Sequence, residues 1–237
     1  MSNYELCNDF KKGFMDGLPI GLGYLSVSFA FGMMAVSMGV SIFDAILISM
    51  TNLTSAGQFA GLDIMMKQNA YIEMALTQII INLRYSLMSL SLSQKIDPKM
   101  KTGERILISF AITDEIFAVA SSQNGKVGKK YFFGLMILPI IGWTLGTALG
   151  AGATSLMPKM VQNCLSVALY GMFIAIIIPP SKKDKNIRKV IIMAAAFSCI
   201  FYFLKPYFSI GSGFVIIICT VLSAGIGAFL YPIKEDA

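Results

Sequence analysis

Eight apolar runs, of which the fourth and the seventh are short for a membrane span, follow one another along the chain and leave it little length for anything else. They are separated by short polar loops and cover residues 17–40, 42–66, 71–92, 106–122, 131–152, 164–180, 190–204 and 208–231. A helix needs about 20 apolar residues to cross a bilayer. Only 14% of the residues are charged, against about 25% in soluble domains. The sequence therefore predicts an all-α, polytopic membrane bundle with about six to eight transmembrane segments.

The runs predict one integral membrane domain over residues 1–237. Residues 1–16 are polar and are expected to form a cytoplasmic segment, with the membrane bundle over residues 17–232. Residues 1–16 lack the basic start, apolar stretch and cleavage site of a signal peptide, so the first run is expected to stay in the membrane. No internal repeat is visible, but inverted structural repeats often leave no trace in one sequence, so an inverted repeat is compatible with this chain.

Basic residues mark the loops expected in the cytoplasm. The net charge is +6, and Lys and Arg lie mainly in short polar segments between the apolar runs. The positive-inside rule predicts this distribution for cytoplasmic loops of a membrane protein. We therefore do not expect nucleic acid as a partner. These segments are Lys11–Lys12, Lys95–Arg105, Lys126–Lys130 and Lys182–Lys189. All of them and the C-terminus lie on one side only if the second and fourth runs are re-entrant or broken. Simple alternation of eight crossings would place Lys95–Arg105 outside, so both topologies remain open.

The composition argues against catalysis inside the membrane. The chain has no His, which removes the commonest metal ligand and proton shuttle, and its four Cys have no CxxC spacing. No metal or cofactor is therefore expected. A rhomboid-like site needs a Ser with a His. An aspartyl pair needs facing carboxylates, whereas Asp114 and Glu115 are adjacent and would point about 100° apart on a helix. We do not expect an enzyme.

The second run carries polar residues and a glycine in its middle: Asn52, Thr54, Ser55, Gly57 and Gln58. Such an interruption suggests two half-helices that meet at mid-depth. The N-terminal N–H groups of a half-helix attract anionic groups such as a carboxylate. These residues are therefore candidate substrate-binding residues. The alternative is a polar patch that joins helices by hydrogen bonds.

Charged residues inside the third and fourth runs form a second candidate site. Arg84 lies ten residues before Gln94, and Asp114 lies ten residues after Glu104, which puts each about 15 Å along a helix from the connecting loop. If the two runs form a hairpin, we expect a buried ion pair between Arg84 and Asp114. Arg84 and Asn82 are candidate substrate residues, and Asp114 and Glu115 are candidates for ammonium binding or proton coupling. A purely structural salt bridge is the alternative.

Gly142, Gly146 and Gly150 make a GxxxGxxxG ridge on the fifth run. This spacing lets helix backbones approach closely. It predicts helix packing, either within the chain or against a partner subunit.

Four motifs in order resemble one known family. They are FxxGFxxGLPIGLGYLSVSFAFG at the start of the chain, from Phe10 into the first run, TSAGQFAG in the second run, INLRYSLMSLSL in the third and TDEIFA in the fourth. The chain resembles the AzlC family, the large subunits of bacterial branched-chain amino acid exporters, over nearly its whole length. The family's Gly-Gln-Phe, Asn-Leu-Arg and Asp-Glu positions fall on Gly57–Phe59, Asn82–Arg84 and Asp114–Glu115. Where the family often has His after the Arg, this chain has Tyr85, which puts a histidine-based proton step in doubt.

The resemblance implies a secondary transporter subunit in the bacterial plasma (inner) membrane that exports valine, leucine, isoleucine and sometimes methionine. It also implies a small AzlD-type membrane subunit as partner and use of the proton motive force. The alternative is a non-transporting scaffold or sensor subunit, in which the charged residues inside the runs are structural.

Overall fold

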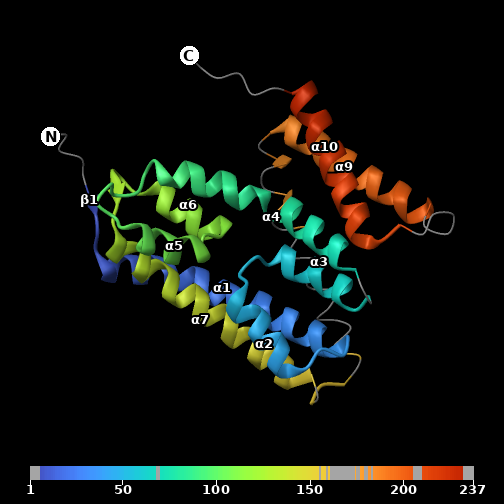
Figure 1. The fold of residues 1–237 in the computed structure, drawn as a ribbon, viewed down its shortest axis with the longest axis horizontal. Helices are drawn as coiled ribbons and strands as arrows, with labels where there is room; N and C mark the ends of the chain where they lie inside the picture. The colour runs from blue at the N-terminus through green and yellow to red at the C-terminus, as the bar shows by residue number, and fades with distance from the viewer. Residues whose placement is uncertain are drawn as a thin grey trace. The chain divides into compact units, whose positions relative to one another are not determined.

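The computed structural model describes residues 6–67, 70–154, 156–158, 160, 174, 177–178, 181–182, 184–204 and 210–231 (Figure 1). Contacts divide the chain into two compact units. The first unit contains Met1–Gln58 and Asn82–Ser166, and the second contains Phe59–Ile81 and Val167–Ala237. Each unit is described by itself, and the single membrane domain predicted over the whole chain stays a prediction.

Helices make up most of the described chain, as predicted. The described chain also contains two strands of two residues each. The helices are α1 (Phe10–Ser37), α2 (Ile42–Thr51), α3 (Ala56–Met65), α4 (Tyr71–Ser93), α5 (Thr102–Phe110), α6 (Asp114–Ser122), α7 (Lys129–Thr154), α9 (Lys185–Leu204) and α10 (Ser212–Leu230). The strands are β1 (Leu6–Cys7) and β2 (Lys126–Val127).

Helix α1 begins at Phe10, before the apolar run and inside the segment predicted to precede the bundle. The Asp9 side chain explains the early start, because its Oδ1 accepts hydrogen bonds from the backbone N–H of Lys11 at 2.9 Å and of Lys12 at 3.4 Å. A capped helix start satisfies N–H groups that otherwise need water, so the helix extends through polar residues.

The second run is broken where the sequence predicted. Helix α2 ends at Thr51, α3 begins at Ala56, and Ser55 between them has a left-handed φ of 43°. Gln58 Nε2 donates to Ser49 Oγ at 3.0 Å although the two are nine residues apart. In a continuous helix they would be separated by about 13 Å along the axis. The chain therefore turns back at this break.

The fourth run is also broken, into α5 and α6. The Thr113 hydroxyl caps the new helix by accepting from Ile116 N–H at 3.4 Å, and Asp114 and Glu115 occupy the first turn of α6. Acidic residues there are favoured by the positive end of the helix dipole. The charged pair therefore begins a half-helix instead of interrupting a continuous one.

A small parallel sheet brings three separate segments to one end of the first unit. Strand β1 pairs with β2, and Ile96 in the α4–α5 loop forms a bridge with Val127. Helix α5 starts just after that loop and α6 ends just before β2, so the α5–α6 hairpin leaves and returns at the same end (Figure 1). The fourth run therefore forms a hairpin of two short helices and not one continuous helix, and its re-entrant topology in the membrane stays a prediction. The sequence did not predict this small sheet, because strands of two residues leave no periodicity to detect.

Basic residues cluster at this sheet end. Lys95 Nζ donates to the Ser121 carbonyl and Lys126 Nζ to the Gln94 carbonyl. Lys129 Nζ lies 2.6 Å from Glu104 Oε1. The Lys129 ammonium, with the Lys101 backbone N–H, holds the pKa of the Glu104 carboxyl below its usual value. A charged Glu104 thus ties the start of α5 to the start of α7.

Helices α1 and α7 pack in parallel along the first unit. A Cβ placed on Gly142, Gly146 or Gly150 would lie 2.3, 2.3 or 2.0 Å from the backbone oxygens of Gly21, Leu25 and Phe29, respectively. Both series advance four residues at a time in the same direction, so the helices run parallel. The predicted packing role of the GxxxGxxxG ridge is confirmed, and its partner is α1 of the same chain.

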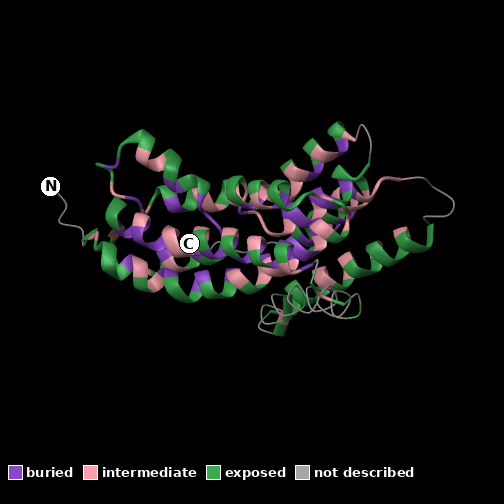
Figure 2. Ribbon diagram, turned by 90° about the horizontal axis from the view of Figure 1, so that it is seen from below, coloured by how far each residue is buried: buried purple, intermediate pink, exposed green. Residues whose placement is uncertain are grey.

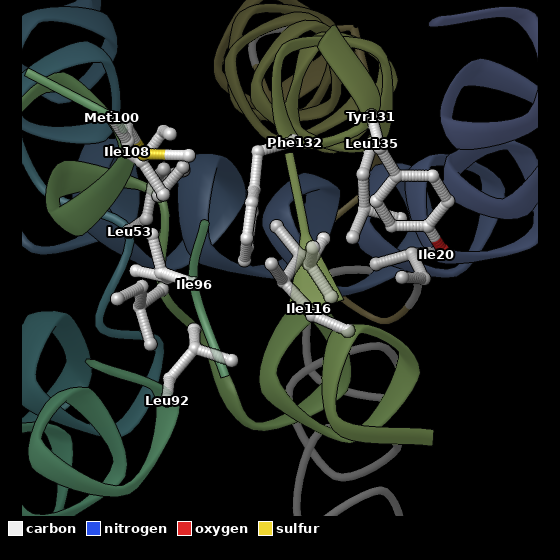
Figure 3. Packing of buried hydrophobic residues seen from close by; sticks show 14 of the residues in the cluster. Ile20, Leu53, Leu92, Ile96, Met100, Ile108, Ile116, Tyr131, Phe132 and Leu135 are labelled. Carbon is white, nitrogen blue, oxygen red and sulfur yellow. The ribbon is translucent and has the colours of Figure 1, made fainter. Parts of the chain in front are cut away.

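A hydrophobic core fills the space between α1, α7, the α2–α3 break and the hairpin of α5 and α6. Figure 3 shows Ile20, Leu53, Ile116 and Leu135 converging from four segments of the first unit. Buried and exposed residues alternate along the helices (Figure 2), and many large apolar side chains are exposed, among them Leu22, Phe43 and Leu87. Apolar side chains exposed on this scale are typical of a surface that faces lipid.

Within the described residues, four helices are long and apolar enough to cross a membrane: α1, α7, α9 and α10. The predicted sixth run, residues 164–180, lies largely outside the described residues. The expected six to eight crossings and the inverted repeat therefore stay predictions.

Candidate functional site

The breaks in the two hairpins place two half-helix starts in the first unit. At the α2–α3 break, Asn52 Oδ1 accepts from Thr54 N–H at 3.0 Å, and the Thr54 carbonyl accepts from Gly57 N–H at 3.1 Å. These bonds fold Asn52–Gly57 into a tight turn. The Thr54 hydroxyl is buried there without a hydrogen-bond partner among the described residues.

Gln58 is the centre of a buried polar network, with only 2% of its surface exposed. Its Oε1 accepts from Trp143 Nε1 at 2.8 Å, and its Nε2 donates to Ser49 Oγ. Ser49 in turn shares a hydrogen bond with Thr147 at 2.7 Å. The network fixes the first turn of α3 against α7.

Tyr24 links the other half-helix to the same region. Its hydroxyl lies 2.5 Å from Glu115 Oε2 and 2.6 Å from Thr113 Oγ1, so it contacts both the cap and the first turn of α6. Its ring packs edge-on against the Trp143 ring, with centroids 5.2 Å apart. Gln58, Trp143, Tyr24 and Glu115 thus form one continuous chain of contacts from the start of α3 to the start of α6.

The ion pair predicted between α4 and the fourth run is confirmed. Arg84 Nη1 lies 2.7 Å from Asp114 Oδ2, and the Arg84 guanidinium also stacks over the Tyr85 ring at 4.9 Å. Its burial is not confirmed, because the two side chains are 45% and 48% exposed. The reason is that Asp114 is the first residue of α6, directly after the turn that joins α5 to α6, and does not lie in the middle of a long packed helix. Asn82 is half-buried on α4, two residues before Arg84.

The two half-helix starts differ in charge. Helix α6 carries Asp114 and Glu115 in its first turn, whereas α3 has no acidic residue there. The positive dipole end of α3 is therefore uncompensated by side-chain charge, while the start of α6 is acidic. A molecule with a carboxylate at one end and an ammonium at the other complements this pair of charges.

The described residues of this site contain no cluster that would make a metal centre. Within those residues no group of three His, Cys, Asp or Glu could hold a metal ion.

Sequence reasoning missed the residues that connect the two breaks. Tyr24, Trp143, Ser49 and Thr147 all lie in apolar runs and looked like packing residues. One signal was available, because Trp143 is the only tryptophan in the chain and a buried indole N–H usually needs an acceptor. That need points to an amide or carboxylate nearby, but not to which one.

Comparison with known proteins agrees with the motifs. The model of the family described as AzlC protein matches residues 19–157, more than half of the chain. An uncharacterized membrane protein of Archaeoglobus fulgidus is 30% identical over 184 residues, which is 77% of this chain and 80% of the relative. Inner membrane protein YgaZ of Escherichia coli is 26% identical over 227 residues, or 93% and 91% of the two chains.

A further relative carries a transport name. The branched-chain amino acid transport protein AzlC of Bacillus subtilis is 24% identical over 181 residues, covering 75% of this chain and 70% of the relative. No solved structure matches the chain. The match to the family model covers both half-helix starts and the α1–α7 pair, so this membrane protein belongs to the AzlC protein family.

Proposed function

We propose that this chain is the large subunit of a secondary transporter that exports branched-chain amino acids. The cargo would be valine, leucine and isoleucine, with methionine as a further candidate. The observation that carries the proposal is the pair of half-helix starts, one acidic and one positive, joined through Tyr24 and Trp143. Membership of the AzlC family and the name of the Bacillus subtilis relative support a transport role.

In this proposal the amino acid binds between the two breaks of the first unit. Its carboxylate faces the positive start of α3 near Ser55–Gln58, or Arg84, while its ammonium faces Glu115 or Asp114. Charged groups in a water-poor site attract each other more strongly than in water. A zwitterion that satisfies both ends therefore gains most from this arrangement.

Transport follows from exchange of partners at the acids. Asp114 is paired with Arg84, and Glu115 accepts from Tyr24. A substrate ammonium or a proton at either acid competes with these bonds and loosens the α6 start from α4 or α1. Re-entrant hairpins that loosen and re-form on opposite sides of a fixed site provide alternating access. The coupling ion in this proposal is the proton.

The proposed setting is the bacterial plasma (inner) membrane, crossed several times by the chain. The relatives are named as membrane proteins, and four described helices have the length and hydropathy to cross. The proposed partner is a small AzlD-type membrane subunit.

The experiment is efflux from liposomes that contain both subunits, with a panel of amino acids and with or without a pH gradient. We expect valine, leucine and isoleucine efflux that the pH gradient accelerates. Arg84→Gln and Asp114→Asn should abolish efflux while the protein still inserts. Full valine efflux by both variants would contradict the proposal.

One observation favours a second reading, in which the chain is a non-transporting scaffold or sensor subunit. The network around Gln58, Ser49 and Thr147 is buried and internally hydrogen-bonded, as expected of polar groups that only hold helices together. Efflux from liposomes that contain only the small subunit separates the two functions. If this chain is a scaffold, efflux should persist when this chain is omitted; if it is the transporter, efflux should be lost.

A further inference from the structure

The second unit contains a pocket that the sequence did not predict. It has a volume of about 630 Å³ and lies between α3, α9 and the start of α10. Ligand pockets typically span about 300–1,000 Å³. Its apolar lining residues are Phe201, Tyr202, Leu204, Ile210, Val215 and Ile216.

Charged residues gather at the end of this pocket where α10 begins. Glu73 is only 8% exposed, and its Oε1 accepts from the Gly213 N–H at 2.7 Å. Gly211 and Gly213 permit this approach, because a Cβ on either would lie within 2.8 Å of Glu73 side-chain atoms. Thr77, fully buried next to Gly213, has a hydroxyl with no hydrogen-bond partner among the described residues. A buried carboxylate thus compensates the positive start of α10.

The remaining polar groups face the pocket itself. Lys67 Nζ lies 3.2 Å from Glu73 Oε1 and donates to Ser212 Oγ at 2.7 Å. Ser212 in turn donates to Asp63 Oδ2. Asp63, Lys67 and Ser212 all line the pocket. The cluster holds two carboxylates, Asp63 and Glu73, and one ammonium, Lys67, so it has one surplus negative charge.

We propose that this pocket is a second binding site for small apolar amino acids, held by their ammonium group at Asp63. Asp63 is an exposed residue that lines the pocket, and its one printed hydrogen bond is accepted by Oδ2 from Ser212, which leaves Oδ1 for an ammonium. Lys67 has three N–H donors and uses two, so the third suits the carboxylate. The aliphatic and aromatic lining suits the side chain. The choice of amino acid as ligand rests on the proposed function, which it extends from one site to two.

The test is ligand binding to purified full-length protein in nanodiscs. Trp143→Phe combined with Tyr202→Trp leaves one tryptophan, placed at the pocket, whose fluorescence reports occupancy. The probes are leucine, isoamylamine, which keeps only the ammonium, and isocaproate, which keeps only the carboxylate. We expect leucine and isoamylamine to change the fluorescence and isocaproate to leave it unchanged, because the surplus charge at the pocket is negative.

Asp63→Asn in this background should raise the Kd for isoamylamine by about 10-fold or more, the usual cost of losing a charged hydrogen-bond partner. The matched control, Asp44→Asn, removes a carboxylate on α2 outside the pocket and should leave the Kd unchanged. Val215→Phe fills part of the pocket without altering a charge, and it should raise the Kd for both leucine and isoamylamine. This variant keeps the proposal testable if Asp63→Asn does not fold. Equal Kd values for Asp63→Asn and the unmodified reporter, or binding of isocaproate as tight as isoamylamine, would overturn the proposal.

Arg84→Gln separates this proposal from the proposed function. It lies in the first unit and should abolish efflux while the pocket reporter still responds to isoamylamine. If Arg84→Gln leaves efflux intact while Asp63→Asn still weakens binding at the reporter, the proposed transport site in the first unit is contradicted and the proposed binding site in the pocket is supported.

Discussion

Asp114 and Glu115 are neighbours in sequence but have different partners. Asp114 pairs with Arg84 on α4, and Glu115 accepts from Tyr24 on α1. Adjacent helical residues point about 100° apart, so one helix start can address two helices at once. Asp114 therefore holds α6 to α4, and Glu115 holds α6 to α1, so substitutions of the two acids need not have the same effect.

Tyr24→Phe removes one hydroxyl and keeps the ring against Trp143. We expect amino acid efflux to fall by about 10-fold, because a hydrogen bond to a carboxylate contributes about 1.5–3 kcal/mol. Efflux from liposomes measures the effect. Tyr71→Phe is the matched control, since Tyr71 is 79% exposed at the start of α4. An equal loss in both variants would show that the Tyr24 hydroxyl has no special role.

Gln58 should contribute to stability through its two buried partners. Gln58→Leu leaves Trp143 Nε1 without its acceptor and Ser49 without its amide donor, at a cost of about 1–3 kcal/mol in the free energy of unfolding. Adding Trp143→Phe removes the unsatisfied donor. We therefore expect the double variant to be less destabilised than the sum of the two single ones, measured as thermal unfolding in detergent. Strict additivity would mean that the hydrogen bond carries no net stability.

At the scale of elements, the parallel α1–α7 pair is the support on which both hairpins are held. Tyr24 and Trp143, which contact the two half-helix starts, come from these two helices. Their spacing is set by glycines whose absent side chains let the backbones touch. A change in that spacing should therefore alter the distance between the two half-helix starts.

Gly146→Ala tests this support. Its Cβ would lie 2.1 Å from Ser28 Oγ and 2.3 Å from the Leu25 carbonyl oxygen, so the helices must separate. Overpacking of this kind costs about 1–3 kcal/mol, and we expect a lower unfolding temperature. Gly152→Ala, also on α7, meets nothing within 4 Å and should be neutral or slightly stabilising. If both variants unfold alike, the close approach does not determine stability.

The sequence predicted the breaks in both hairpins and one cross-helix ion pair, because charged and polar residues in apolar runs are rare and easily recognised. It did not predict how the breaks connect. Tyr24, Ser49, Trp143 and Thr147 are ordinary residues of apolar helices, and only the parallel packing of α1 on α7 brings them together. The charged pocket was missed for a similar reason, since Asp63, Lys67 and Ser212 are far apart in the chain and meet only through folding.

At the scale of the whole molecule, charge and topology constrain each other. The basic clusters could share one side only with broken or re-entrant runs, and the chain does turn back at both breaks. The sheet of β1, β2 and Ile96 then holds the N-terminal segment and two basic loops at one end of the first unit. This end is the expected cytoplasmic face, because Lys and Arg are retained there.

Cysteine labelling in intact cells tests this topology. In a background without the four native cysteines, Lys11→Cys, Lys99→Cys and Asn124→Cys should all be protected from an impermeant maleimide and react only after permeabilisation. Ser41→Cys lies beyond the far end of α1, a helix of 28 residues that is about 42 Å long, and should react in intact cells. The informative position is Lys99, which simple alternation of eight crossings puts outside. Reaction of Lys99→Cys in intact cells, with Lys11→Cys protected, would separate the α4–α5 loop from the N-terminal segment across the membrane and rule out the shared sheet.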